Sequence, residues 1–448
     1  MGNIKFAGLW SAVPFVSSDA WDRGASVSAS QLWWRTSRLT HGTQEAEREY
    51  VDVQIAYPSH GSTPPRPPLR STAACRHVPL PAEVILYILE LASTTATLQV
   101  DTSALLAASL VCRSWSVPGQ SLLFRHIDLR SQPSYAAFAA AVSPATPRGR
   151  ALAQGIRSMR AVLDPAQPLY LRARSFAHAV TLCPKLRAIE LSCYGTPPPP
   201  ATKACDARTF FDEQALAYLR AGPAVSSLRF ANWSSDTDAL PSLLAVYPAL
   251  HTLSVRGAAD VIAAPLPALH APALHVALEP PLAPALLDWL ATGPPVRSID
   301  FTRQPSPELL ERVLKVHGPT LAGLALPSLF PATRALVRAH CPRLAALRVE
   351  HAWTSASVFA DAPDALRHVA FGTDLETSLA PVLAFVRAHP GVERVQMMLW
   401  KRSPGERDCH PQLEELRALC AERGIEFGVD TDVRAFRAVA ASPSFFHL

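Results

Sequence analysis

Lysine is almost missing from this sequence, and its basic residues form no patch. Of the 42 basic residues only five are lysine, at positions 5, 185, 203, 315 and 401, and the arginines are dispersed along the chain. Against 37 acidic residues this leaves a net charge of only +5. Nucleic-acid-binding proteins concentrate their basic residues in one patch or stripe. We therefore expect no nucleic-acid partner.

Cysteine is also sparse, with eight residues in 448 and no CxxC pair. Disulfide frameworks pack cysteines densely into small secreted domains, and structural zinc sites bring them in close pairs. Neither pattern is present, so we expect reduced cysteines, no bound metal, and a cytoplasmic and/or nuclear location. Cys183 and Cys341 both precede a proline at the same repeat position. We expect them to be small buried residues rather than reactive thiols.

No apolar run is long enough to span a membrane. The stretch Ala258–Leu278 is the most apolar, but it contains three prolines, two histidines and Asp260. A membrane-spanning helix needs roughly 20 consecutive, predominantly apolar residues. We expect no membrane partner.

Motifs that carry catalysis are missing as well. The sequence has no GxxxxGK[ST] loop, no GxGxxG after a strand, no GxSxG and no HExxH. It therefore contains no motif for a phosphate-binding loop, a hydrolase nucleophile or a zinc protease. We predict no catalytic residue, no cofactor and no enzymatic activity.

Three histidines recur at the ends of expected helices: His317, His340 and His389. They could be a row of metal ligands, but equivalent positions of stacked repeats lie one repeat apart and cannot converge on one ion. We favour imidazoles that bond the free carbonyl groups at helix C-termini.

The chain is rich in apolar residues, at 49%, and in proline, with 42 residues. This composition can bury a large core, and its many helix breakers favour short elements joined by tight turns. Three zones differ in pattern. Residues 1–76, which end in a proline-rich linker, are predicted to be a disordered leader; residues 77–130 have a compact helical pattern; and residues 131–448 are repetitive.

The repetitive zone contains a six-residue core with apolar residues at its first, fourth and sixth positions. The first positions are 156, 186, 225, 250, 273, 296, 321, 344, 366 and 392, and from 225 onward they are 22–26 residues apart. Segments of helical period separate the cores, for example Pro307–His317 and Ala332–His340. A strand and a helix at this period are typical of leucine-rich repeats. The expected fold class is therefore α/β, a degenerate solenoid of about ten strand–helix repeats.

Two further strands are expected at the ends of this zone, at His126–Leu129 and Ile425–Val429. The repeats also differ from the usual leucine-rich pattern, because the asparagine of the turn is replaced, for example by Trp233, Gln304 and Asp374. The turns must therefore be stabilised by other means.

The second zone predicts two helices. Leu80-Pro81-Ala82-Glu83 opens the first, since proline is tolerated in a first turn and an acidic residue suits the positive end of the helix dipole. Asp101 or Ser103 caps the second, which is expected to run to Trp115 and to end at Pro118-Gly119. The connection between them spans 93–101.

These helices resemble the F-box. The resemblance rests on LPAEVILYILEL at 80–91 followed by LLAASLVCRSW at 105–115, an LPxE helix and then a helix ending in VCRxW. It covers about 50 of the 448 residues. With the degenerate repeats that follow, the layout resembles the F-box proteins of mushroom-forming (basidiomycete) fungi. The connection at 93–101 is longer than the family's usual turn.

The resemblance implies a function. F-box proteins are substrate receptors of Skp–cullin–F-box ubiquitin ligases: the F-box docks a Skp-type adaptor, which bridges to a cullin, and the repeats bind a protein target. By motif position the residues implied to contact the adaptor are Leu80, Pro81, Val84, Ile88, Leu91, Val111, Cys112 and Trp115.

A target bound to the strands would contact the residues that alternate with the core. The candidates are Arg229, Arg256, Arg348, Glu350 and Arg394, together with Trp353 and Trp400 just beyond the strands. Solvated charges and rings packed under loops are an equally good interpretation. Two other function classes stay open: a binding scaffold without ligase activity, and, with no supporting cluster of residues, an enzyme.

Overall fold

The computed structural model describes residues 80–94, 100–197, 209–257, 266–270, 274–293, 295–351, 359, 362–400 and 410–440. The chain forms two units, Met1–Val84 and Ile85–Leu448. The first helix of the described part, α4 (Ala82–Ser93), contains the boundary between them. The division into 1–76, 77–130 and 131–448 stays a prediction.

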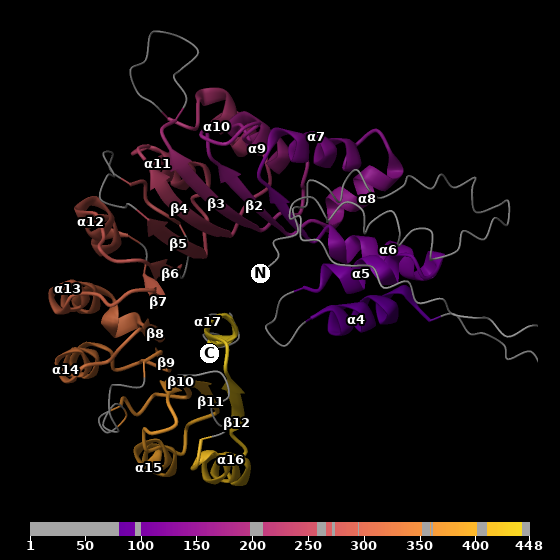
Figure 1. Ribbon diagram of the computed structural model, residues 1–448. Helices are drawn as coiled ribbons and strands as arrows, with labels where there is room; N and C mark the ends of the chain where they lie inside the picture. Colours follow the sequence, from indigo (N-terminus) through magenta and orange to yellow (C-terminus); the bar gives the residue numbers. More distant parts are fainter. Residues whose placement is uncertain are drawn as a thin grey trace, which may run out of the picture. The chain divides into compact units, whose positions relative to one another are not determined.

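The second unit is built on one parallel sheet of twelve strands that pair in chain order (Figure 1). The strands are β1 (His126–Leu129), β2 (Ser158–Leu163), β3 (Ala188–Gly195), β4 (Ser227–Ser234), β5 (Thr252–Gly257), β6 (Leu274–Leu278), β7 (Val296–Phe301), β8 (Gly323–Leu326), β9 (Ala346–Val349), β10 (His368–Thr373), β11 (Arg394–Leu399) and β12 (Glu426–Asp430). This confirms the α/β class. The predicted cores fall on β2 to β11, and both terminal strands are present as β1 and β12.

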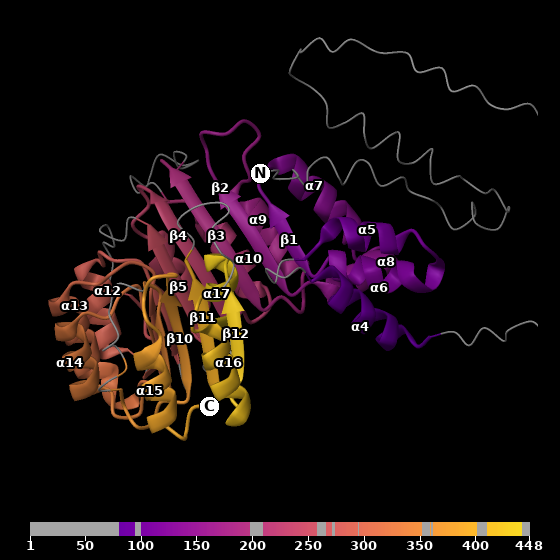
Figure 2. The same ribbon diagram turned by 60° about the horizontal axis from the view of Figure 1, so that its bottom comes forward.

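Helices alternate with the strands. They are α7 (Gln132–Ala141), α8 (Pro147–Gly155), α9 (Ala173–Thr181), α10 (Glu213–Ala221), α11 (Ala239–Val246), α12 (Pro284–Thr292), α13 (Pro307–His317), α14 (Pro331–His340), α15 (Ala380–Ala388) and α16 (Leu413–Glu422). Helices α9 to α16 lie on one face of the sheet, and the last helix, α17 (Val433–Ala440), lies on the other (Figures 1 and 2). We call the face turned away from α9–α16 the inner face.

The sheet is stacked so that equivalent core positions are in register. Ile189 pairs with Leu228, which pairs in turn with Leu253, and all three side chains are buried. Side chains alternate between the two faces of a strand, so these residues point toward the helices and the residues between them line the inner face. The core thus runs without interruption from repeat to repeat.

Helix α13 shows how a repeat encodes its helix. The Ser306 hydroxyl accepts the N–H of Leu309 at 3.2 Å, and Pro307 occupies the first turn, where its missing N–H is not needed. Leu310, Val313 and Leu314 are buried at helical spacing. The prolines that exclude long helices therefore start the short ones.

His317 and His389 contact carbonyl groups of helices. The buried ring of His317 places its Nε2 2.9 Å from the carbonyl oxygen of Leu290, at the end of the preceding helix α12. Nδ1 of His389 lies 3.1 Å from the carbonyl oxygen of Phe385 in its own helix. Both contacts agree with carbonyl capping, although for His317 the capped helix is the neighbouring one.

The helical zone differs from its prediction in one place. The second helix does not run to Pro118-Gly119: it forms α5 (Thr102–Ser109), and a separate helix α6 (Arg113–Leu123) passes through Pro118. A Cβ on Gly119 would lie 3.2 Å from Cβ of Ser109. The glycine therefore allows α5 and α6 to pack closely and does not end a helix. Asp101 caps α5 as expected, accepting N–H groups of Ser103 and Ala104.

We predict that Gly372→Ala destabilises the sheet strongly. A Cβ at this position of β10 would clash with the carbonyl oxygen of Glu350 on the neighbouring chain segment, so backbone must move and the free energy of unfolding should fall by about 3 kcal/mol, the upper end of the usual cost of overpacking. Gly391→Ala is the matched control, because its Cβ would meet no atom within 4 Å. Urea denaturation followed by circular dichroism measures both, and equal stability of the two variants would contradict the packing.

We also predict that the free energy of unfolding depends on pH through the protonation of His317. Burial lowers the pKa of this imidazole, so the unfolded chain, with an ordinary pKa of about 6.5, takes up the proton first as the pH falls. The free energy of unfolding should therefore decrease below about pH 6.5, by at most about 1.4 kcal/mol per pH unit for one such group. His317→Gln should flatten this decrease between pH 6.5 and 5; identical slopes in both proteins would show that His317 does not contribute.

Candidate protein-interaction surfaces

Helices α4, α5 and α6 share a small apolar core of their own. Ile85 and Leu89 of α4 are buried with Leu105 of α5 and Leu122 of α6, and Trp115 packs against them half-buried. Ile85 and Leu89 are four residues apart, so one face of α4 is fully used by this core.

Helix α4 carries a second apolar face that is exposed among the described residues. Tyr87 and Ile88 lie three and four residues after Val84, Leu91 lies four and three residues after them, and all four are exposed, Leu91 at 61%. Leu80, just before the helix, is exposed too, as is Pro81. An amphipathic helix on a folded core has one apolar face and one polar face; α4 has two apolar ones.

Exposed apolar residues continue at the junction of α5 and α6. Leu110 and Val111 are each 66% exposed, Val117 is 74% exposed, and Cys112 at the start of α6 is exposed as well. Within the described ranges, nine of the fourteen exposed large apolar side chains lie between Leu80 and Val117. We call the exposed residues of α4 from Tyr87 onward, together with those of the α5–α6 junction, the apolar helical surface.

The long connection after α4 starts and ends at neighbouring points. The Asp101 N–H donates to the carbonyl oxygen of Ser93 at 2.6 Å, and Thr94 and Val100 form an antiparallel bridge. Leu89 of α4 and Leu105 of α5 meet in the shared core.

The residues that the resemblance implies for the adaptor thus fall into two groups. Seven are exposed: Ile88, Leu91, Val111 and Cys112 on the apolar helical surface, and Leu80, Pro81 and Val84 in the first unit. Trp115 packs instead against the internal core, half-buried. Tyr87, Leu110 and Val117 belong to the same surface and were missed, although Tyr87 is three residues after Val84 and its helical spacing could have identified it.

The inner face of the sheet is lined with charges, most of which pair across strands. Arg160 lies 3.2 Å from Glu190 of the next strand, and Glu279 lies 2.8 Å from Arg303. Arg394 binds Glu426 of β12 at 2.8 Å through its Nε. Opposite charges on neighbouring strands of one face stabilise the pairing modestly.

Arg229 and Arg256 differ from these residues. Both are exposed, and neither has an ion-pair partner in the part of the chain that the structure describes. Arg256 pairs in register with Ala231, two residues after Arg229 on β4, so the two guanidinium groups lie on the same face of adjacent strands. Tyr194 and Trp233, which pair in register at the ends of β3 and β4, expose their rings on the same face. We call these four residues the cationic–aromatic surface.

Arg348 and Glu350 are not available to a partner in this structure. Both are only 1% exposed. Arg348 lies 2.6 Å from Asp300 and 3.3 Å from Glu350, and Glu350 accepts two hydrogen bonds from Arg437 of α17, at 2.8 and 2.5 Å. They were expected to contact a target or to be solvated, because strand alternation does not reveal that α17 covers this part of the inner face.

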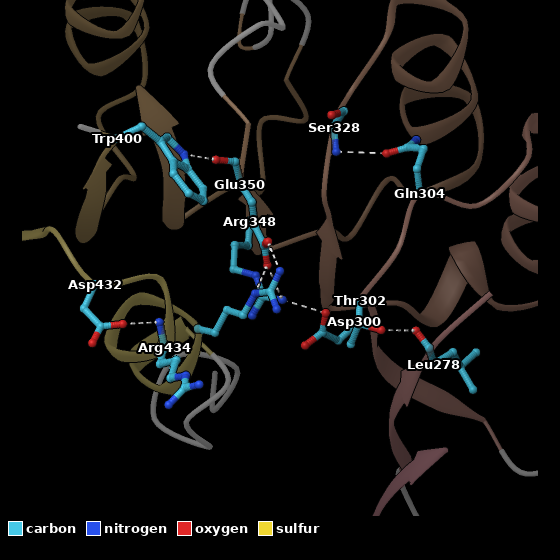
Figure 3. A network of polar contacts seen from close by, with 11 residues as sticks. Leu278, Asp300, Thr302, Gln304, Ser328, Arg348, Glu350, Trp400, Asp432 and Arg434 are labelled. Atoms are coloured by element: carbon cyan, nitrogen blue, oxygen red, sulfur yellow. Dashed lines mark hydrogen bonds and ion pairs between the residues drawn. The ribbon is translucent and has the colours of Figure 1, made fainter. Parts of the chain in front are cut away.

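Of the two tryptophans expected to contact a target, Trp400 and Trp353, only Trp400 lies among the described residues. The Trp400 indole donates to the carbonyl oxygen of Glu350 at 2.8 Å and stacks on His351, so it is a packed, half-buried ring (Figure 3). Trp353 lies outside the described residues.

Other chemistry is limited. Cys183 and Cys341 are fully buried, as predicted, and burial raises the pKa of each thiol to about 12, so both stay protonated at neutral pH. Among the residues with described positions, no group of three His, Cys, Asp or Glu side chains could hold a metal ion. In the same part of the chain no helix is long and apolar enough to cross a membrane.

Comparison with known proteins adds no assignment: no protein-family model matches the chain, and no curated protein matches it significantly. Function must therefore be argued from the two surfaces.

We predict that the inner-face arginines divide into structural and available ones. Arg348→Ala leaves Asp300 and Glu350 without their shared partner in a buried site, so the free energy of unfolding should fall by about 3–5 kcal/mol. The double variant Arg229→Ala/Arg256→Ala should change it by no more than about 0.5 kcal/mol. Chemical denaturation of each protein measures this, and a large loss in the double variant would place those arginines in the structural class.

Proposed function

We propose that this protein is the substrate-recognition subunit of a Skp–cullin–F-box type ubiquitin ligase. In this proposal the apolar helical surface docks a Skp-type adaptor, and through it a cullin, while the sheet is a degenerate leucine-rich-repeat solenoid that holds a protein target. The protein itself catalyses nothing, and it acts in the cytoplasm and/or nucleus.

The second apolar face of α4 is the observation that carries the adaptor part of the proposal. Tyr87, Ile88 and Leu91 are exposed although Ile85 and Leu89 already fill the internal core. Exposed apolar side chains that gather on one face of a helix indicate an interaction site. It lies on the helices whose sequence resembles the F-box, and a partner that covered it would remove apolar area from water, which is the main favourable contribution to most protein association.

The target part is supported by the cationic–aromatic surface. Arg229 and Arg256 are exposed without a charged partner within the described ranges, beside the exposed rings of Tyr194 and Trp233. Arginine, tyrosine and tryptophan are the residue types most enriched among binding hot spots. Unpaired guanidinium groups favour a target segment that brings carboxylate or phosphate oxygens.

A binding scaffold without ligase activity is the alternative, and it needs the inner face alone. The adaptor experiment distinguishes the two: a folded chain that binds its target but no adaptor would support the scaffold.

We predict that the chain binds a fungal Skp-type adaptor and that Leu91→Asp weakens binding at least ~20-fold. A charge placed in the centre of an apolar interface costs about 2 kcal/mol or more. Titration calorimetry with the purified adaptor measures the dissociation constant, and Val111→Asp should have an effect of the same sign.

Val316→Asp is the matched control, because Val316 is an exposed apolar residue on α13, remote in sequence from the apolar helical surface. It should leave adaptor affinity unchanged. If wild-type protein with an intact circular dichroism spectrum does not bind the adaptor, or if Leu91→Asp binds as well as wild type, the adaptor proposal fails.

A further inference from the structure

The inner face is occupied at β9–β11 by the chain's own helix α17. The helix begins at Val433, three residues after β12 ends at Asp430. Asp432 starts it, since Oδ1 accepts the Arg434 N–H at 2.7 Å and its carbonyl oxygen accepts the Phe436 N–H (Figure 3). Helix α17 thus turns back from the last strand onto the face opposite α9–α16 (Figure 1).

The surface under α17 is shaped by small residues. Phe436 is fully buried against Ala346, Ala370 and Met398, with Trp400 at the side. On β2, β4 and β5 the inner face carries the long exposed side chains Arg160, Arg229 and Arg256; on β9 and β10 it carries alanines, which leave room for an aromatic ring. We call the residues Ala346, Arg348, Glu350, Ala370 and Met398, together with Asp300, the α17 seat.

The carboxylates of the α17 seat also favour a positively charged side chain on its occupant. Asp300 and Glu350 place two carboxylates around the single guanidinium of Arg348 (Figure 3). Arg437 of α17 supplies the second positive charge through a bidentate contact with Glu350, whose carboxylate raises the pKa of that guanidinium. Without α17 the buried Glu350 would share Arg348 with Asp300, which is costly for a desolvated charge.

The guanidinium of Arg348 in the α17 seat has two nitrogen atoms without a hydrogen-bond acceptor among the described residues. Nε and Nη1 of Arg348 are buried and have no hydrogen-bond partner in the described part of the chain. Buried donors are normally satisfied, and each exception requires an explanation. A ligand that placed an oxygen atom there would make bonds that α17 does not make.

We propose that the α17 seat is a binding site for a short helical segment that presents an aromatic side chain followed by an arginine, and that α17 fills it as an exchangeable intramolecular occupant. A partner segment of the same chemistry, with an oxygen acceptor for Arg348, replaces α17. This site is separate from the apolar helical surface, and it does not depend on adaptor binding.

The short connection to β12 explains why α17 occupies the seat. A tether of a few residues gives an effective concentration in the millimolar range. A seat with an intrinsic dissociation constant of ~10–100 µM is then filled in most molecules, yet opens often enough for a competitor to enter.

The first test uses hydrogen exchange of the full chain. An exchangeable α17 opens locally, so its backbone amides should exchange at least ~100-fold faster than those of β11, and Glu350→Gln should accelerate α17 further while leaving β11 unchanged. Amides of α17 that exchange as slowly as those of β11 would overturn the proposal, because the helix would then open only with the whole sheet.

The second test supplies the helix from outside. A fluorescent peptide of residues 430–440 should bind the full-length variant Phe436→Ala/Arg437→Ala, whose own helix is released, with a dissociation constant of ~10–100 µM, and should bind wild type at least ~10-fold more weakly. The same peptide carrying Arg437→Ala is the control and should lose at least ~10-fold in affinity.

Two outcomes of this test overturn the proposal. One is a variant that keeps the circular dichroism spectrum and melting transition of wild type but does not bind the peptide. The other is a variant that no longer folds, since α17 would then be part of the core and not an occupant of a site.

Discussion

The architecture depends on the fact that one strand–helix repeat cannot bury its own apolar face. Each strand covers the next, so the row that contains Ile189, Leu228 and Leu253 is a core only when the repeats are stacked in register. The same geometry uses up the helix-facing side of every strand and leaves the inner face, where Arg229 and Arg256 lie. The repeat core therefore lies on one face of the sheet, and we propose that a target binds to the other.

The stacking of repeats does not bury two surfaces: the inner face of the sheet at β9–β11 and the second apolar face of α4. At β9–β11 the chain's own α17 covers the inner face with Phe436 and neutralises Glu350 with Arg437. On α4 the second apolar face, with Tyr87, Ile88 and Leu91, has no cover in the described structure. We propose that an adaptor covers it, and that the seat under α17 is shared between this helix and a partner segment.

Periodicity predicted the sheet well because apolar spacing is a local property. The ten cores, the strand at His126–Leu129 and the strand at the C-terminal end could all be located from residues within one repeat. It failed where the deciding contact is distant in sequence. Glu350 was expected at the surface, but its partner Arg437 lies 87 residues away; Gly119 was expected to end a helix, but it packs against Ser109 of α5. The pattern at Leu80–Leu91 identified an apolar helix, and only the fold separated its buried face from its exposed one.

The central claim is that the second apolar face of α4 is covered by a Skp-type adaptor, and hydrogen exchange of the full chain with and without saturating adaptor tests it most directly. If the adaptor docks there, the amides of α4 and of the α5–α6 junction should become at least ~10-fold more protected, while those of α13 and β4 should not change. Unchanged exchange in α4, or protection confined to the sheet, would contradict the account.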